Sequence, residues 1–228
     1  MQPPVSSAEG EAPRRRVLLV DDHEMVRDGL RLIIDGTSDL RVCADVPDAE
    51  QACVAVAELE PDVAVIDLSL RPSGIDGLGL VKWIHAHHPK TRTVVSSMHE
   101  EQIYGERALR AGASGYVSKS APARTVIDAI RQACSGHLHF SAELVDAMLR
   151  RAVQGGAHRR SSIEQLSDRE LQVFRAIGEG LASKEIAKAL NVSVSTVDTY
   201  RERLKIKLDI SSAAELVHRA TRWTLENR

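Results

Sequence analysis

The sequence has few aromatic and cysteine residues and no long apolar run. Phe, Trp and Tyr make up 3% of the 228 residues, and Cys43, Cys53 and Cys134 lie singly in apolar segments, with no CxxC spacing. Isolated cysteines indicate a reduced protein without a structural zinc site. The longest apolar run, Ala52–Ala57, is far below the roughly 20 residues that cross a bilayer. Because residues 1–13 also lack the pattern of a secretory signal, we expect a cytoplasmic protein without a membrane partner.

Charge is nearly balanced over the whole chain but differs between its two parts. The net charge is −2, yet Arg14–Gly136 holds 15 Lys/Arg against 18 Asp/Glu, whereas Ala157–Arg228 holds 13 against 10. An acidic part joined to a basic part suggests cation binding in the first and polyanion binding in the second.

Short apolar runs alternate with helical patterns along the first part of the chain. The expected strands are Arg16–Val20, Leu40–Ala44, Val63–Ile66, Thr93–Ser97 and Gly115–Val117, and the expected helices are Met25–Ile34, Ala49–Leu59, Leu78–Ala86, Gln102–Ala111 and a fifth from Pro122 to about Ser135. Strands that alternate with helices at this spacing form a parallel sheet covered on both faces. The pattern predicts a flavodoxin-like, doubly wound α/β domain with a five-stranded parallel sheet.

Beyond this domain the strand signal disappears. Ala142–Val153 has the pattern of a connecting helix, and Ser167 with Glu170 forms a capping box at the start of the next helix. Shorter helical patterns follow to the end of the chain. We therefore predict a disordered lead over 1–13, the sheet domain over 14–137, a connecting helix and linker over 138–162, and a small all-α domain over 163–228.

Polar residues follow four of the expected strands. Asp21 and Asp22 end the first strand, Asp67 the third and Ser97 the fourth, and Lys119 follows the fifth. The carboxyl ends of parallel strands meet at one edge of a doubly wound sheet. Clustered carboxylates repel one another unless a hard cation neutralises them, which suits Mg²⁺. One carboxylate can then attack a phosphoryl group, with lysine and hydroxyl groups stabilising the added charge.

With these residues in place, the first domain resembles the receiver domain of two-component response regulators. The resemblance implies that a sensor histidine kinase phosphorylates Asp67, and that Lys119 and Ser97 assist. It also implies that Mg²⁺ is bound by Asp21, Asp22, Asp67 and the Ser69 backbone carbonyl. Tyr116 matches the family's aromatic switch, which would move inward with Ser97 on phosphorylation. Two departures are a longer loop after Asp67, Leu70–Gly77, and Ser97 in place of the commoner threonine.

The second domain resembles the LuxR/FixJ/NarL-type helix-turn-helix output domain. The resemblance rests on Arg169-Glu170, Gly178–Ala187, Ser195-Thr196-Val197 and Lys207-Leu208. It implies that the chain regulates transcription as a dimer on promoter DNA. The implied DNA-binding residues are Lys184, Ser195, Thr196, Asp198, Thr199, Arg201, Glu202, Arg203 and Lys205, and the implied dimer contacts are Ala213, Leu216, Val217 and Ala220.

Two other functions remain as alternatives to a phosphorylation-controlled regulator, which would not be an enzyme. An aspartate-nucleophile phosphatase needs a second acid two residues after Asp67, where this chain has Ser69. A phosphorylation-independent regulator, or an antagonist that binds proteins instead of DNA, is favoured by the acidic Asp198 and Glu202, which replace lysines common in the family.

Overall fold

The computed structural model describes residues 13–70, 75–98, 101–153, 163, 165–190 and 192–226. Its strands are β1 (Arg15–Val20), β2 (Leu40–Val46), β3 (Val63–Ile66), β4 (Arg92–Ser97) and β5 (Gly115–Ser118). The helices around them are α1 (Glu24–Asp35), α2 (Ala49–Leu59), α3 (Gly77–His87), α4 (Glu101–Ala111) and α5 (Ala123–Cys134). After α6 (Ala142–Val153) come α7 (Asp168–Gly178), α8 (Ser183–Ala189), α9 (Val194–Leu208) and α10 (Ala213–Glu226). The predicted lead, apart from Pro13, and residues 154–162 of the predicted connecting helix and linker lie outside the described residues.

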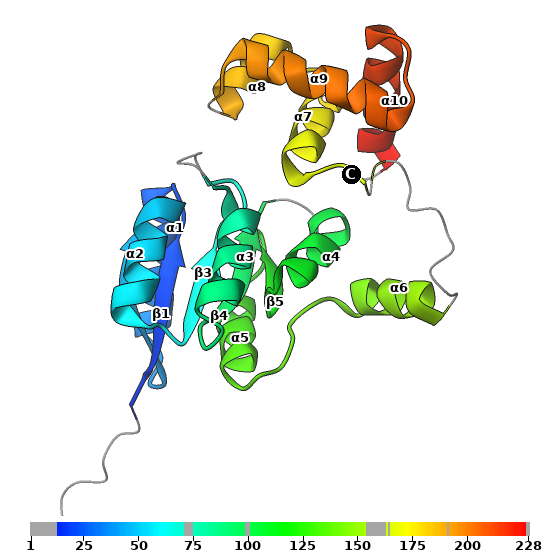
Figure 1. Ribbon diagram of the computed structural model, residues 1–228. Helices are drawn as coiled ribbons and strands as arrows, with labels where there is room; N and C mark the ends of the chain where they lie inside the picture. Colours follow the sequence, from blue (N-terminus) through cyan, green and yellow to red (C-terminus); the bar gives the residue numbers. More distant parts are fainter. Residues whose placement is uncertain are drawn as a thin grey trace, which may run out of the picture.

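The five strands form one parallel sheet in the order β2-β1-β3-β4-β5 (Figure 1). The chain winds outward from β1 in both directions, so the order of the strands reverses beside β1 and β3. At such a reversal the loops after neighbouring strands separate and leave a crevice at the carboxyl edge of the sheet. Asp21 and Asp67 follow these two strands and therefore lie beside each other.

Alternation along the strands divides the core into two layers. Val17 and Leu19 point to the face that α1 and α5 cover, where they join Ile130 in one apolar cluster. Leu18 and Val20 point to the opposite face, which α2, α3 and α4 cover. Because both faces are buried, β3 in the middle of the sheet is apolar at every position instead of every second one. We call this unit, β1 to α5, the sheet domain.

The helical domain, α7 to α10, packs around Phe174 and Leu204, both of which are fully buried. The predicted capping box starts α7: the Glu170 backbone N–H donates to the Ser167 hydroxyl, and the Glu170 carboxylate accepts from the Ser167 N–H. At the other end of α7, Gly178 allows close packing, since a Cβ there would lie 2.1 Å from the Thr224 hydroxyl oxygen. The predicted fold, a doubly wound sheet followed by a small all-α domain, is confirmed.

The segment between the two domains follows the edge of the sheet. The His139 carbonyl accepts a hydrogen bond of 2.8 Å from the Tyr116 N–H, and the Glu101 carboxylate accepts one from the Ser141 N–H. Helix α6 then packs against α4. Within the described part of the chain, every helix is too short or too polar to pass through a lipid bilayer.

Candidate functional site

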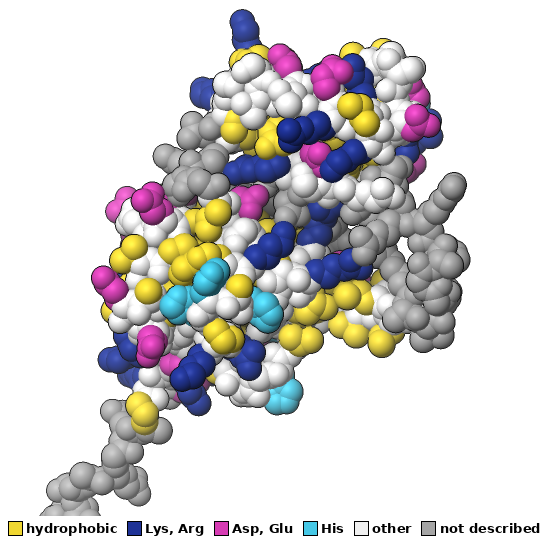
Figure 2. Space-filling model, viewed as in Figure 1, with side chains coloured by type: hydrophobic (Ala, Val, Ile, Leu, Met, Phe, Trp, Pro, Cys, Tyr) yellow, Lys and Arg dark blue, Asp and Glu magenta, His cyan; other side chains and the backbone are white. Residues whose placement is uncertain are grey.

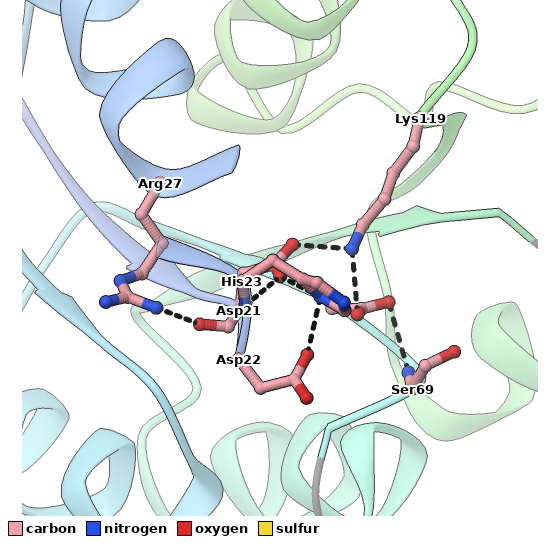
Figure 3. Close-up of polar contacts among 7 residues, drawn as sticks. Asp21, Asp22, His23, Arg27, Ser69 and Lys119 are labelled. Carbon is pink, nitrogen blue, oxygen red and sulfur yellow. Dashed lines mark hydrogen bonds and ion pairs between the residues drawn. The ribbon is translucent and has the colours of Figure 1, made fainter. Parts of the chain in front are cut away.

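The predicted residues meet at the carboxyl edge of the sheet. The Lys119 ammonium lies 2.6 Å from Asp21 Oδ2 and 2.8 Å from Asp67 Oδ2, so it joins the ends of β1 and β3 from the loop after β5. Asp21 and Asp67 are 3% and 2% exposed, and Lys119 is the cation that neutralises them inside the protein. Figure 3 shows Lys119 reaching towards the loops that carry Asp21 and Ser69.

Backbone and side-chain donors hold the two carboxylates in place. Asp21 Oδ1 accepts a 2.9 Å hydrogen bond from the His23 N–H, and Asp67 Oδ1 accepts one of 3.1 Å from the Ser69 N–H. The Arg27 guanidinium donates to the Asp21 carbonyl oxygen at 2.6 Å (Figure 3). These contacts fix the orientation of both carboxylates. Asp67 is therefore preorganised for reaction with an incoming electrophile.

Burial dominates the electrostatics of the site. It raises the pKa of Asp67 above the usual value for aspartate, although the hydrogen bond from Lys119 opposes the shift. Burial lowers the pKa of Lys119, but its hydrogen bonds to Asp21 and Asp67 outweigh that effect and the net pKa is raised. Lys119 is therefore charged at neutral pH. A carboxylate with a raised pKa is a better nucleophile than an exposed aspartate, provided that the cation beside it keeps it ionised.

The acidic residues fit a divalent cation. One ligand atom from each of Asp21, Asp22, His23 and Asp67 lies within 4.8 Å of the others. Three carboxylates make a hard oxygen donor set, and the backbone carbonyl predicted for Ser69 would add a fourth oxygen. The arrangement matches a divalent cation site of the receiver type.

Sequence reasoning missed His23 and Gly77 at this edge. The His23 Nδ1 atom lies 2.8 Å from Asp22 Oδ1 and 3.2 Å from Asp21 Oδ1 (Figure 3). The signal in the sequence is its position directly after the acidic pair Asp21-Asp22. A Cβ on Gly77 would lie 2.2 Å from the Asp67 carbonyl oxygen, so only glycine allows α3 to start this close to the site.

The predicted switch residues are already buried together. Ser97 is 0% exposed and Tyr116 is 4% exposed, and their hydroxyl groups hydrogen-bond to each other. Burial raises the pKa of the Tyr116 phenol, so it remains neutral. Since Tyr116 already lies inside, this conformation does not need the inward movement that the resemblance implied.

The helical domain exposes the predicted DNA-reading side of α9. Ser193 caps the start of α9, and its hydroxyl accepts a hydrogen bond from the Thr196 N–H. Val197, Leu204 and Leu208 face the core of the helical domain. All nine predicted DNA-binding residues, eight on α9 and one on α8, are accessible: Ser195, Asp198, Thr199, Glu202, Arg203 and Lys184 are exposed, and Thr196, Arg201 and Lys205 are half-buried.

The two acidic residues of α9 have partners on the surface. Glu202 pairs with Lys205 at 2.8 Å, and the Asp198 carboxylate accepts a hydrogen bond of 3.1 Å from the Ser183 hydroxyl. An ion pair reduces the repulsion between Glu202 and a DNA phosphate.

Only part of the predicted dimer surface lies on the outside of α10. Leu216 and Ala220 are 0% exposed because α10 packs this side against α7, whereas Val217 is 40% exposed and Ala213 is exposed. Of the four predicted dimer contacts, Ala213 and Val217 are therefore the two that a second copy of the chain could reach.

Comparisons with known proteins agree with both halves of this geometry. The chain matches the response regulator receiver domain over residues 17–131 and the luxR family of bacterial regulatory proteins over residues 164–220. The chain belongs to the LuxR-type response regulators. A response regulator of this kind is a transcription regulator of a two-component system, so the phosphatase and the antagonist are not favoured.

Two similar proteins align with both domains of this response regulator, and a third aligns with part of the chain. The oxygen regulatory protein NreC of Staphylococcus aureus is 33% identical over 214 residues, which cover 92% of this chain and 98% of NreC. RcsB from Salmonella enterica serovar Typhimurium, solved bound to promoter rprA with the phosphomimetic BeF3⁻, is 25% identical, with a TM-score of 0.60 over 92% of this chain and 99% of RcsB. A LuxR-family response regulator from Aurantimonas sp. SI85-9A1 is 32% identical, with a TM-score of 0.55 over 62% of this chain and 99% of that protein.

Proposed function

We propose that Asp67 accepts a phosphoryl group from a phosphohistidine on a sensor kinase, and that the modified chain binds promoter DNA as a dimer in the cytoplasm. The observation that carries the proposal is the position of Lys119, 2.6 Å from Asp21 and 2.8 Å from Asp67 at the edge of the sheet. The proposal divides the chain into a receiver over 14–137 and an output domain over 163–228.

In the proposed reaction, a carboxylate oxygen of Asp67 forms a bond to phosphorus as the bond to the donor imidazole breaks. The imidazole leaves as a neutral ring after taking a proton from solvent. Lys119 binds one phosphoryl oxygen and the Ser97 hydroxyl donates to another, so that charge developing in the transition state meets fixed donors. The Ser69 N–H, which now holds Asp67 Oδ1, keeps the acyl phosphate in line.

Asp21, Asp22 and Asp67, with the Ser69 carbonyl, would hold Mg²⁺. Bound there, Mg²⁺ supplies charge neutralisation between the carboxylates and the incoming phosphoryl group. Asp21 and Lys119 line the side of the site nearer the protein core, and Asp22 and His23 line the side nearer solvent.

The phosphoryl group would act on the output domain through the Ser97–Tyr116 hydrogen bond and α4. When the Ser97 hydroxyl turns to the phosphoryl oxygen, its hydrogen bond to Tyr116 is lost or changed. The loss of this bond shifts the populations of the conformations of α4 and β5. On DNA, Asp198, Thr199 and Glu202 would reach bases near the start of α9, while Lys184 and Lys205 contact phosphates. RcsB, solved on a promoter, supports this mode of binding.

The test is phosphorylation of the purified chain by phosphoramidate with Mg²⁺, followed by intact mass. We expect a Mg²⁺-dependent phosphoryl adduct in the wild type that Asp67→Asn abolishes. Asp128→Asn, an exposed change of the same kind on α5, is the matched control and should be labelled normally. Equal labelling of Asp67→Asn and the wild type would refute the assignment of Asp67.

The same samples test the output step. Phosphorylated wild type should sediment as a dimer and bind a promoter fragment at a lower protein concentration than the unphosphorylated protein does. Val217→Glu, on the exposed side of α10, should prevent formation of the dimer. Promoter affinity that does not change with the phosphoryl adduct would favour a phosphorylation-independent regulator instead.

A further inference from the structure

The outward side of α9 carries acidic residues, in a domain whose visible surface mixes Asp and Glu with Lys and Arg (Figure 2). On the opposite side, Val197 and Leu204 are 0% exposed and face the core. Because an α-helix turns about 100° per residue, Thr199 and Glu202, each two residues from one of these core residues, point away from the core. Asp198 lies one turn before Glu202, and all three outward residues are exposed. We call Asp198, Thr199 and Glu202 the reading face.

The reading face presents hydrogen-bond acceptors. The carboxylate groups of Asp198 and Glu202 accept hydrogen bonds and do not donate them. The Thr199 hydroxyl has one proton, and it donates this proton to the Ser195 carbonyl oxygen at 2.9 Å. A group that docks on the reading face therefore meets acceptors from all three side chains.

Neighbouring side chains orient both carboxylates. The Ser183 hydroxyl, at the start of α8, donates to Asp198 Oδ1 at 3.1 Å, and the Lys205 ammonium lies 2.8 Å from Glu202 Oε1. A carboxylate has about four lone-pair sites on its two oxygens, so one such contact orients the group and leaves capacity for a further donor. The two acids are therefore oriented acceptors that can still bind an amino group.

The four bases differ in what they offer to an acceptor in the major groove. Cytosine presents the N4 amino donor, whereas guanine presents the N7 and O6 acceptors and thymine the O4 acceptor. Adenine presents its N6 donor beside the N7 acceptor, which repels a carboxylate. Cytosine is thus the base that suits the reading face best. Asp198 and Glu202 are about 6 Å apart along α9, since each residue rises about 1.5 Å, and this distance spans about two base pairs of about 3.4 Å each.

We propose that the reading face selects cytosine: Asp198 and Glu202 each accept a hydrogen bond from a cytosine N4 amino group, at two C·G pairs about two base pairs apart in each half-site. The lysines that are common at these positions in the family would instead donate to guanine O6 and N7. This inference rests on the proposed binding to promoter DNA, and it adds which bases this chain recognises.

The experiment selects binding sites for the full-length chain, treated with phosphoramidate and Mg²⁺, from a pool of random-sequence DNA duplexes. Wild type is compared with Glu202→Gln and Asp198→Asn, which keep the size of the side chain and one acceptor oxygen but remove the charge. Glu226→Gln, the same change at an exposed position of α10, is the matched control. The affinity of each protein for the selected duplex, and for duplexes changed at one base pair, is then measured by fluorescence anisotropy at one salt concentration.

We expect wild type and Glu226→Gln to bind the selected site about tenfold more tightly than a site with A·T in place of the C·G pair read by Glu202. Glu202→Gln should prefer the A·T pair, because an amide accepts from adenine N6 and donates to N7. Asp198→Asn should change the preference in the same way at the other C·G pair only. An unchanged base preference in either variant would overturn the assignment of that acid. Failure of the wild type to select any sequence would instead overturn the proposed binding to promoter DNA.

Discussion

Replacing Lys119 with methionine tests the charge balance on which the site depends. Lys119 is the cation between Asp21 and Asp67, whose side chains are 5% and 1% exposed, and the Lys119 side chain is itself only 10% exposed. Methionine keeps much of the volume but leaves the two carboxylates facing each other without a cation. Because removal of one partner from a buried ion pair costs about 3–5 kcal/mol, we take about 3 kcal/mol for this partly hydrated site.

That loss should appear as a lower melting temperature. For a domain of this size, 1 kcal/mol shifts the midpoint by about 4 °C, so Lys119→Met should unfold about 12 °C below the wild type in EDTA. A divalent cation at one hundred times its dissociation constant contributes about 2.7 kcal/mol, so Mg²⁺ should return the melting temperature of Lys119→Met to near that of the wild type in EDTA. The assay is thermal unfolding followed by circular dichroism, with and without Mg²⁺.

The stability difference between Lys119→Met and the wild type should change with pH in one direction. Burial raises the pKa of Asp67 in the folded chain, so the ionised carboxylate destabilises the fold and protonation relieves the penalty. The gap between Lys119→Met and the wild type should narrow as the pH falls from 7 towards about 4. Lys90→Met, an exposed change with the same loss of charge, is the control. If Lys119→Met is no less stable than this control in EDTA, the reasoning about the ion pair is wrong.

Three further outcomes follow from the helical domain. Gly178→Ala should destabilise it by about 1–3 kcal/mol in chemical unfolding, because its Cβ would lie 2.1 Å from a hydroxyl oxygen of α10, whereas Gly29→Ala, with open space around it, should not. Burial alone raises the pKa of Glu170, but the hydrogen bonds from Lys207 and Ser167 and the charge of Lys207 together outweigh burial and lower it. The ionised form of Glu170 stabilises the fold at neutral pH, and this stabilisation is lost in acid. As the pH falls below about 5, the free energy of unfolding should therefore decrease less in Glu170→Gln than in the wild type. Asp198→Lys should steepen the salt dependence of DNA binding by about one unit of slope in a filter-binding titration; an unchanged slope would place this residue away from DNA.

Much of the site was predictable because strand ends in a parallel sheet share one edge. The apolar runs before Asp21 and Asp67 locate both residues at strand ends without any tertiary information, and Ser97 and Lys119 follow by the same rule. The capping box of Ser167 is likewise local, because its two hydrogen bonds join residues three apart.

Other features depended on contacts between segments distant in the sequence. Helical spacing could not tell which side of α10 meets α7, so Leu216 and Ala220 were assigned to a dimer surface although both are buried. The role of Gly77 depends on its distance from the Asp67 backbone, and that distance is set by how α3 packs on the sheet.

The sequence by itself determined the two folds and the position of the candidate carboxylates at strand ends, because periodicity and residue type act over a few neighbours. Only the tertiary structure decided that Lys119 joins Asp21 to Asp67, that Ser97 and Tyr116 are already paired, and that α7 lies over the carboxyl edge of the sheet. These are contacts between residues up to about one hundred positions apart, and their geometry follows from the packing of whole elements against one another.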